Sequence, residues 1–311
     1  MAFSPIRAVA GEALRVGKSN ANAFAYMPLD VGVQKGIFNK HGLDVEIVNF
    51  GRAPMLDMAL TGGTVDIGLT SGVELALIEK GLPVKGVAAI LGAPVELTFS
   101  VVPDSPIKTV ADLKGKSVAV SQIASMTGWV VAQLSQQQGW GPEGIKRATI
   151  GPPDGYWAAL MTKQIDAASV DISSALQAER LGRGRILITD GDVVKSFVAN
   201  LVFATNTLME KNPRVIRSFL TAWFETVGFM RADKAATIAI AKEVQHVDAD
   251  IAAGTYDIVM KEVSNDGRFS NTALDELRQT FIDLHVLDNP PDMKTLVTEK
   301  YLPPVAGKSA P

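Results

Sequence analysis

The sequence predicts an α/β protein built as two lobes, and three patterns support this prediction. Strand-like and helix-like segments alternate along residues 14–91. A long segment starting at Phe50 is similar in sequence to one starting at Ile150. After residue 205 the chain carries helical patterns without further strands. Alternation of this kind favours mostly parallel sheets with helices on both faces.

Apolar periodicity and turn residues define the first elements. Short apolar or alternating runs predict strands at residues 14–20, 43–50, 64–69 and 84–91. Helical spacing predicts helices at residues 28–39, 54–60 and 73–80, the last closed by Gly81. Each helix connects two strands, as in a parallel sheet.

The similarity between two segments one hundred residues apart predicts that one structural unit occurs twice. The segment "FGRAPMLDMALTGGTVDIGLTSGVELALIEKG" matches "IGPPDGYWAALMTKQIDAASVDISSALQAERL" in order and character. The identical positions include Gly51/Gly151, Ala59/Ala159, Leu60/Leu160, Asp66/Asp166 and Glu79/Glu179. Residues 114–139 likewise repeat the opening, with a strand, a polar turn and a helix. The alternative is the generic order of strand, loop and helix in any α/β chain. For Asp66 and Asp166 we expect a structural hydrogen-bonding role.

The last third of the chain predicts how the lobes are connected. Residues 200–205 form a strand, and helices follow with caps at Asn212-Pro213, Asp233, Asp248 and Asn271-Thr272. These helices are expected to pack on the first lobe. That lobe then comprises residues 13–98 and 205–311, and residues 99–204 form an inserted second lobe. Two crossings, near residues 97–101 and 200–205, leave room for a hinge and a ligand cleft.

Composition excludes several classes of function. The net charge of −3 over 311 residues provides no basic face for nucleic acid. No apolar run reaches the roughly 20 residues of a membrane-spanning helix. There is no cysteine, and His41, His246 and His285 lack ligand spacing, so no metal site is predicted. Nucleotide-binding motifs are also missing, so we expect no cofactor.

Candidate ligand contacts lie where strands are expected to end, because ligands of open parallel sheets bind beyond the carboxyl ends of the strands. Small, hydroxyl, amide and aromatic residues gather at these points. In the first lobe they are Asn20, Asn22, Phe24, Tyr26, Thr70, Ser71 and Gly72, with Asn200 on the returning strand. In the second lobe they are Ser125, Met126, Thr127, Tyr156 and Asp171. Arg52 is the arginine that we would test as an anion contact.

Each candidate also has a purely structural interpretation. Thr70, Ser71, Ser125, Thr127 and Asp171 are all placed to cap a following helix, whether or not a ligand binds. Trp129 and the pair Tyr156-Trp157 are more often core residues than stacking platforms, and Arg52 is more often a solvated charge. A carboxylate at Asp171 disfavours a bare anion and suits an amine or N–H donor.

The chain resembles a known family at several of these residues. The segment "AYMPLDVGVQKGIFNKHGLDVEIVNF" resembles the opening of the NMT1/THI5-like solute-binding proteins, which serve nitrate, sulfonate, taurine and pyrimidine-precursor ABC importers. "TGGTVDIGLTSG", "GLPVKGVAAI", "IKTVADLKGKSVAV" and "LMEKNPRVIRSFLTAW" follow in the order of that family. The resemblance covers roughly residues 13 to 302.

The resemblance implies a type II periplasmic binding fold in which lobe closure captures a small organic solute. It also implies export to the periplasm, delivery to an ABC permease at the inner membrane, and no catalysis. The chain differs from the family pattern at two places that are expected to line the pocket. Val170-Asp171-Ile172 replaces the frequent Trp-Glu-Pro, and Ala124-Ser125-Met126-Thr127 replaces Gly-Ser-Thr. The ligand therefore stays open between a sulfonate, a carboxylate and a pyrimidine-like compound. The alternative function is an enzyme on the same bilobal fold, such as a relative in pyrimidine-precursor synthesis.

The first twelve residues suggest export. Ala8-Val9-Ala10 has the small-x-small form of a signal-peptidase site, although the charged and apolar stretches expected before it are missing. Our hypothesis is that residues 1–12 are the remnant of an export signal. A disordered alanine-rich leader is the alternative.

Overall fold

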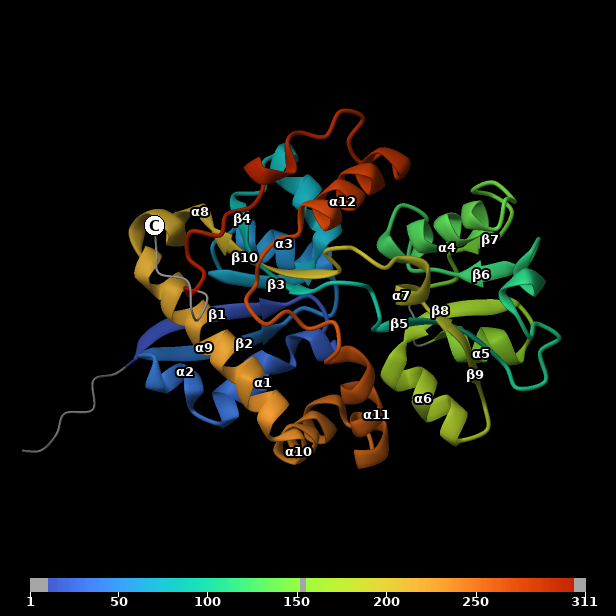
Figure 1. Cartoon of the computed structure of the whole chain (residues 1–311), viewed down its shortest axis with the longest axis horizontal. Helices are drawn as coiled ribbons and strands as arrows, with labels where there is room; N and C mark the ends of the chain where they lie inside the picture. The colour runs from blue at the N-terminus through green and yellow to red at the C-terminus, as the bar shows by residue number, and fades with distance from the viewer. Residues whose placement is uncertain (1–10, 152–154, 305–311) are drawn as a thin grey trace, which may run out of the picture.

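The computed structural model describes residues 11–151 and 155–304, and it contains two lobes side by side (Figure 1). Each lobe is built on a five-stranded sheet. The predicted leader lies almost wholly outside the described residues, and so does its proposed cleavage site. The α/β class and the two-lobe organisation predicted from the sequence are confirmed.

The first sheet has the order β2-β1-β3-β10-β4. Its strands are β1 (Glu12–Lys18), β2 (Leu43–Asn49), β3 (Ile67–Ser71), β4 (Val84–Leu91) and β10 (Asn200–Thr205). β1 pairs in parallel with β2 and β3, whereas β10 is antiparallel to β3 and β4. The sheet is therefore parallel except for the strand that returns from the other lobe.

The second sheet repeats this plan, with the order β7-β6-β8-β5-β9. Its strands are β5 (Leu97–Val101), β6 (Ser117–Ala119), β7 (Lys146–Ala148), β8 (Ala167–Asp171) and β9 (Arg185–Thr189). β6 is parallel to β7 and β8, and β5 is antiparallel to β8 and β9. Again the strand that arrives from the opposite lobe is the antiparallel one.

The predicted lobe boundary needs a correction at β10. The sequence prediction placed residues 200–204 in the second lobe, but β10 lies in the first sheet, hydrogen-bonded to a strand on each side. Likewise, residues 97 and 98 begin β5 in the second sheet. The crossings are the segments just before these strands, at residues 92–96 and 194–199. A strand pattern locates a strand but does not identify its sheet. That lobe motion occurs at these crossings stays a prediction.

Helices cover both sheets. Those between strands are α1 (Met27–Gln34), α2 (Ile37–Lys40), α3 (Ala53–Thr61), α4 (Met126–Gln137), α5 (Tyr156–Met161), α6 (Ile172–Arg180) and α7 (Asp190–Val193). The carboxyl-terminal set is α8 (Asn206–Lys211), α9 (Pro213–Ala232), α10 (Lys234–Gln245), α11 (Ala249–Val259) and α12 (Asn271–Asp283). The 3-10 helices are η1 (Phe24–Tyr26), η2 (Gly72–Lys80), η3 (Val110–Leu113) and η5 (Met293–Thr295).

The helices deviate from prediction at two places. The expected helix over residues 28–39 is divided into α1 and α2, because Gly36 adopts a left-handed backbone with φ 68°. Residues 73–80 form the 3-10 helix η2 rather than an α-helix. As expected, the carboxyl-terminal helices pack on the first lobe: Phe219 of α9 stacks on Phe38 of α2 at 5.4 Å between ring centroids.

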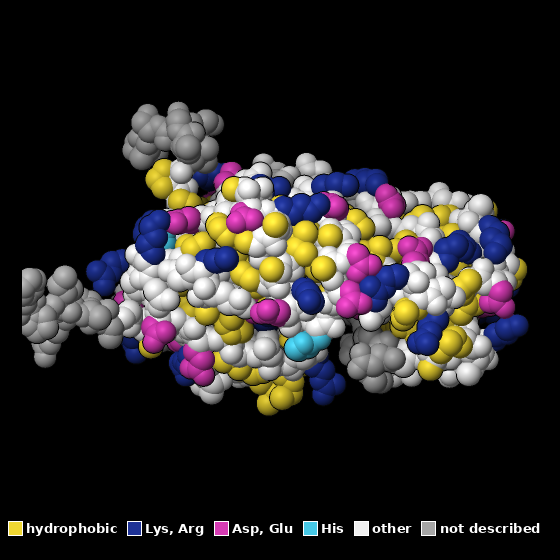
Figure 2. Space-filling view, turned by 90° about the horizontal axis from the view of Figure 1, so that it is seen from below, with side chains coloured by type: hydrophobic (Ala, Val, Ile, Leu, Met, Phe, Trp, Pro, Cys, Tyr) yellow, Lys and Arg dark blue, Asp and Glu magenta, His cyan; other side chains and the backbone are white. Residues whose placement is uncertain are grey.

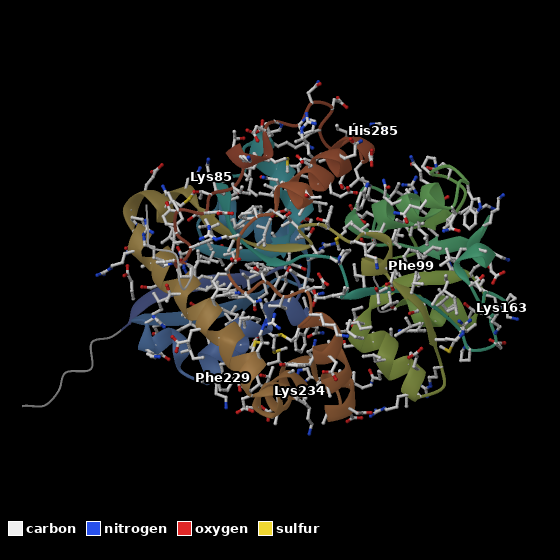
Figure 3. The ribbon with its side chains drawn as sticks, viewed as in Figure 1. Lys85, Phe99, Lys163, Phe229, Lys234 and His285 are labelled. Atoms are coloured by element: carbon white, nitrogen blue, oxygen red, sulfur yellow. The ribbon has the colours of Figure 1, made fainter. Side chains whose placement is uncertain are left out.

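The core is continuous through the crossings. The larger apolar cluster extends from the first lobe through Phe197 and Val198 to Trp129 of α4 and Phe99 of β5. Figure 3 places Phe99 inside the second lobe. A smaller cluster, which includes Tyr156 and Leu160, lies on the other face of the second sheet. In the described part of the chain, no helix combines the length and apolar character needed to cross a bilayer.

The lobes also contact each other on both sides of the crossings. Between α6 and α11, Arg180 forms ion pairs with Asp250 at 2.9 Å and with Asp248. Figure 2 shows acidic and basic side chains side by side where the lobes meet on this face. Between α4 and α12, Trp129 Nε1 and Gln133 Nε2 donate to Asp283 at 3.0 and 2.9 Å.

Candidate functional site

The carboxyl ends of β3 and β8 both reach the crossings between the lobes. After β3, the backbone N–H of Gly72 donates to the carbonyl of Ala199 in the returning crossing at 3.2 Å. After β8, the N–H of Ile172 donates to the carbonyl of Glu96 in the outgoing crossing at 2.8 Å. The two strand ends predicted to carry ligand contacts are thus both anchored to the segments that join the lobes.

Glu96 contacts both lobes. Its backbone carbonyl accepts from Ile172 of the second lobe, and its Oε1 accepts from the N–H of Ala25 in the first lobe at 2.6 Å. Burial raises the pKa of Glu96 to about 7. The charge of Asp171 adds to this shift, whereas the N–H groups of Ala25 and Phe24 oppose it.

Tyr26 lies at the centre of a buried polar network. Its hydroxyl bonds with Ser19 Oγ at 3.2 Å and accepts from Asn200 Nδ2 at 2.8 Å. Burial strongly raises the pKa of Tyr26, and the charges of Glu96 and Glu74 raise it further. Both carboxylates therefore act on one hydroxyl at the junction of the lobes.

Glu74 is the second carboxylate that acts on Tyr26. It lies in the first turn of η2, directly after β3. Its Oε2 atom is shielded from solvent and has no hydrogen-bond partner among the described residues. Burial raises the pKa of Glu74 to about 7, with a further increase from the charge of Asp57. Burial likewise raises the pKa of Asp57 to about 6.

Among the described residues, basic side chains pair with groups other than these carboxylates. Within the described ranges, no Lys, Arg or His forms an ion pair with Asp57, Glu74, Glu96 or Asp171. Lys18 is buried at the end of β1, but its Nζ binds Asp30 at 2.9 Å and the carbonyl of Ala21 at 3.0 Å. Lys18 is therefore already paired and does not neutralise these carboxylates.

On the second-lobe side, a group of hydroxyls precedes α4. Ser125 caps this helix, accepting from the N–H of Gly128 at 3.3 Å. Ser121 Oγ lies 3.0 Å from both Ser125 Oγ and Thr127 Oγ1. Met126 packs against the core. These hydroxyls bond with one another and with the backbone, as the capping interpretation predicts.

The other sequence candidates have the following surroundings. Asp171 is exposed and caps α6, accepting from Ser173 Oγ at 2.7 Å and from the N–H of Ser174 at 2.9 Å. Ser71 caps η2 by accepting from the N–H of Val73 at 3.3 Å. Thr70 is fully buried, and its hydroxyl has no partner in the described structure.

The aromatic and amide candidates divide between core and surface. Phe24 is buried and packs edge-to-face on Tyr256, with ring centroids 6.2 Å apart. Tyr156 is buried in the smaller apolar cluster. Asn20 and Asn22 are exposed and form a local turn, in which Asn20 Oδ1 accepts from the N–H of Asn22 at 3.0 Å. Arg52 is exposed at the start of α3.

Burial of Tyr156 and Phe24 argues against a direct ligand contact in this arrangement, because each ring is enclosed by apolar neighbours. The core interpretation also holds for Trp129, which stacks on Phe197. Ligand contact by the remaining candidates stays a prediction.

Sequence reasoning missed Glu74, Glu96 and Asp57. A signal was present for the first two, since each is a single carboxylate inside an apolar run, "GVELALI" and "APVELTF". A charged residue in such a run is either at the surface or costly to bury. Only the packing of the two lobes decides between these cases.

Hollows in the surface lie away from these carboxylates. One of about 480 Å³ lies between α4 and α12 and is lined by Gln133, Arg147, Asp283 and His285 among others. Another of about 200 Å³ lies between Trp157 of α5 and Leu181 beyond α6. In the part of the chain that the structure describes, no three acidic or histidine side chains are grouped to hold a metal ion.

Comparison with known proteins identifies the family. The model of the family described as NMT1/THI5 like matches residues 23–236. The chain belongs to the NMT1/THI5-like family. A candidate binding protein of Brucella abortus is 24% identical over 225 residues, covering 70% of this chain and 67% of the relative. A candidate aliphatic sulfonates-binding protein of Escherichia coli K12 is 26% identical over 215 residues, covering 68% of this chain and 65% of the relative.

Solved structures agree on the fold of this family member. The periplasmic aliphatic sulphonate binding protein SsuA of Escherichia coli superimposes with a TM-score of 0.79 at 22% identity, covering 92% of this chain and 97% of that one. The chain therefore has the periplasmic binding protein fold, as expected. An enzyme is also among the relatives: a 4-amino-5-hydroxymethyl-2-methylpyrimidine phosphate synthase of Saccharomyces cerevisiae is 22% identical over 222 residues, 67% of this chain and 64% of the enzyme.

Proposed function

We propose that this protein binds a small organic solute at the junction of its two lobes and delivers it to an ABC permease at the inner membrane, as a periplasmic binding component. One observation carries the proposal: polar groups of the first lobe and of the outgoing crossing meet around Tyr26 and Glu96, and Glu96 also accepts a hydrogen bond from Ile172 of the second lobe. A solute held there contacts both lobes only when they are together, so its binding favours the closed arrangement.

Membership of the family and the sulfonate-binding names of two similar proteins support this proposal. The same names make a sulfonate one candidate ligand, beside a carboxylate and a pyrimidine-like compound. The proposed location outside the cytoplasm follows from the similarity to a periplasmic protein.

A thermal-shift screen of sulfonates, carboxylates, pyrimidines and nitrate tests the proposal. A ligand that binds only the folded protein raises the free energy of unfolding by about 2.7 kcal/mol at one hundred times its Kd. Calorimetry on each hit should give one site per chain. If no compound shifts the transition, solute binding is contradicted.

An enzyme on the same fold is the second candidate, and the similarity to the yeast synthase is the observation that favours it. The two candidates differ in turnover. Mass spectrometry of each bound solute after prolonged incubation should return the unchanged compound if the protein is a binding protein. A new product that disappears in a Glu74→Gln variant would support the enzyme instead.

A further inference from the structure

We infer that the two lobes separate at the edge between α4 and α12, that Asp283 is the latch holding this edge closed, and that the contact between α6 and α11 is the pivot. The two contacts lie on opposite sides of the crossings (Figure 1). This motion goes beyond the proposed function, because it belongs to the protein itself and can be measured without any solute.

The contact between α6 and α11 is closely packed. A Cβ atom on Gly254 of α11 would lie 3.0 Å from Leu176 Cδ1 of α6, and Leu176 itself packs against the larger apolar cluster. Nearby, the guanidinium group of Arg180 pairs with Asp250 at 2.9 Å and with Asp248. Separating these helices would break both apolar packing and a forked ion pair, so the lobes are expected to turn about this contact.

The contact between α4 and α12 spans a hollow instead. This hollow of about 480 Å³ is lined by both lobes, with Ile123 and Gln136 from the second lobe and Ile282 and His285 from the first. Figure 3 labels His285 at this edge of the molecule. Because side chains do not fill the space between the two helices, little dispersion energy opposes their separation.

Asp283 supplies the hydrogen bonds that cross this edge. Its Oδ2 accepts from Trp129 Nε1 at 3.0 Å and from Gln133 Nε2 at 2.9 Å, both in α4. Its Oδ1 accepts from Gln279 Nε2, one turn earlier in α12, at 2.8 Å. Hydrogen bonds to a carboxylate are about twice as strong as those between neutral groups. A single side chain of the first lobe therefore holds two donors of the second.

Trp129 connects this latch to the returning crossing. Its ring stacks on Phe197 of that crossing, with centroids 5.2 Å apart, and the residue is only 1% exposed. The indole N–H group therefore exchanges Asp283 for water only when the edge opens. This N–H group reports directly on the state of the latch.

Pulsed electron paramagnetic resonance between spin labels tests the inference, with no solute added. The chain has no cysteine, so introduced cysteines carry the labels uniquely. Gln138→Cys with Thr272→Cys measures the distance between α4 and α12, and Gln177→Cys with Lys261→Cys measures that between α6 and α11. All four positions are exposed.

Replacing Asp283 with alanine should raise the population of long α4–α12 distances at least threefold and leave the α6–α11 distances unchanged. Asp283→Asn keeps one acceptor and should give a smaller rise. Asp275→Ala, at an exposed carboxylate of the same helix, should give none. A cooperative urea-unfolding transition shows that each variant is folded. Unchanged α4–α12 distances in Asp283→Ala contradict the latch, and longer α6–α11 distances contradict the pivot.

The indole N–H signal of Trp129 provides a second readout by ¹⁵N nuclear magnetic resonance. The chain has four tryptophans, and the signal that disappears in Trp129→Phe assigns this one. In Asp283→Ala the signal should shift and its exchange with water should become at least threefold faster, because the edge opens. A shift without faster exchange would mean that the bond is lost while the edge stays closed, which contradicts the latch. Arg180→Ala should leave the signal unchanged. If it accelerates exchange as Asp283→Ala does, the two edges open together and the pivot is wrong.

Discussion

The turns after β3 and β8 occupy equivalent places in the two sheets, one hundred residues apart in the sequence. In both, the first residue caps a helix: Ser71 caps η2 and Asp171 caps α6. In both, the next N–H group bonds to a crossing between the lobes. The acidic groups differ, because Asp171 is exposed and its Oδ1 accepts two hydrogen bonds, whereas Glu74 Oε2 is shielded and has no partner among the described residues.

This difference separates a carboxylate that caps a helix from one whose Oε2 is shielded within the first turn. A carboxylate at a cap position receives N–H donors from the first helical turn and needs no further partner. Glu74 lies three residues further along, in the first turn of η2, where Ser71 and its own backbone N–H bond its carboxyl group and Oε2 has no partner among the described residues. Equivalent position in a repeated unit therefore does not imply equivalent function.

The largest effect is expected from replacing Gly72 with alanine. A Cβ atom there would lie 2.0 Å from the carbonyl oxygen of Val198, whereas the equivalent Ile172 is accommodated with its side chain. Because the obstacle is backbone, we expect a loss of about 3 kcal/mol in the free energy of unfolding. Urea unfolding measures it, with Gly228→Ala as control, since Gly228 has open space around it. A loss below about 1 kcal/mol would show that the backbone of the crossing shifts to make room for the Cβ atom.

Neutralising Glu74 should stabilise the free protein. The pKa of Glu74 is raised to about 7 in the folded state, so its ionised form lowers stability as the pH rises from about 4.5 through 7. We expect Glu74→Gln to gain about 2 kcal/mol at pH 8 and nothing near pH 4, by thermal unfolding without ligand. Glu79→Gln should show neither effect.

The equivalent turn should respond with the opposite sign. Asp171→Ala removes a cap that accepts from both Ser173 and Ser174. We expect a loss of about 1 kcal/mol at pH 8, again from thermal unfolding. If both variants change stability in the same direction, the distinction between the two turns is wrong.

An effect of the same size as that at Asp171 is expected at another equivalent pair, Gly63 and Lys163. Both have left-handed backbones, with φ 68° and 58°, and Lys163 lies at the outer end of the second lobe (Figure 3). Because glycine adopts this conformation without a steric cost, Lys163→Gly should gain about 1 kcal/mol in urea unfolding. Gly63→Ala, the converse change, should lose a similar amount. No gain at Lys163 would indicate an unrecognised contact of its side chain.

Much of the fold was predictable because its signals are local. The repeat predicted from Asp66 and Asp166 is confirmed in detail: Asp66 accepts from the N–H of Arg15 at 3.1 Å, and Asp166 accepts from the N–H of Ser117 at 2.8 Å. The predicted structural role of both carboxylates is thereby confirmed. Burial acts to raise the pKa of Asp166, but the bonds from Ser117 and the charges of Lys116 and Lys146 outweigh it and lower the pKa.

The candidate site was predictable only as a set of strand ends. Ser71, Ser125 and Asp171 were expected to follow strands and to cap helices, and all three do so. Tyr156 was favoured for the cleft from its place on the helix, yet it faces the smaller apolar cluster. Helical position specifies a direction around one axis but does not identify which neighbour lies in that direction.

The sequence by itself determined the repeated strand-helix unit, the helix caps and the absence of cysteine chemistry, because these depend on residues close together in the chain. Only the tertiary structure decided that β10 joins the first sheet and that Glu74 and Glu96 become shielded beside Tyr26. Burial and charge coupling are produced by segments distant in sequence, such as η1 and the outgoing crossing, which are joined by the bond from Ala25 to Glu96.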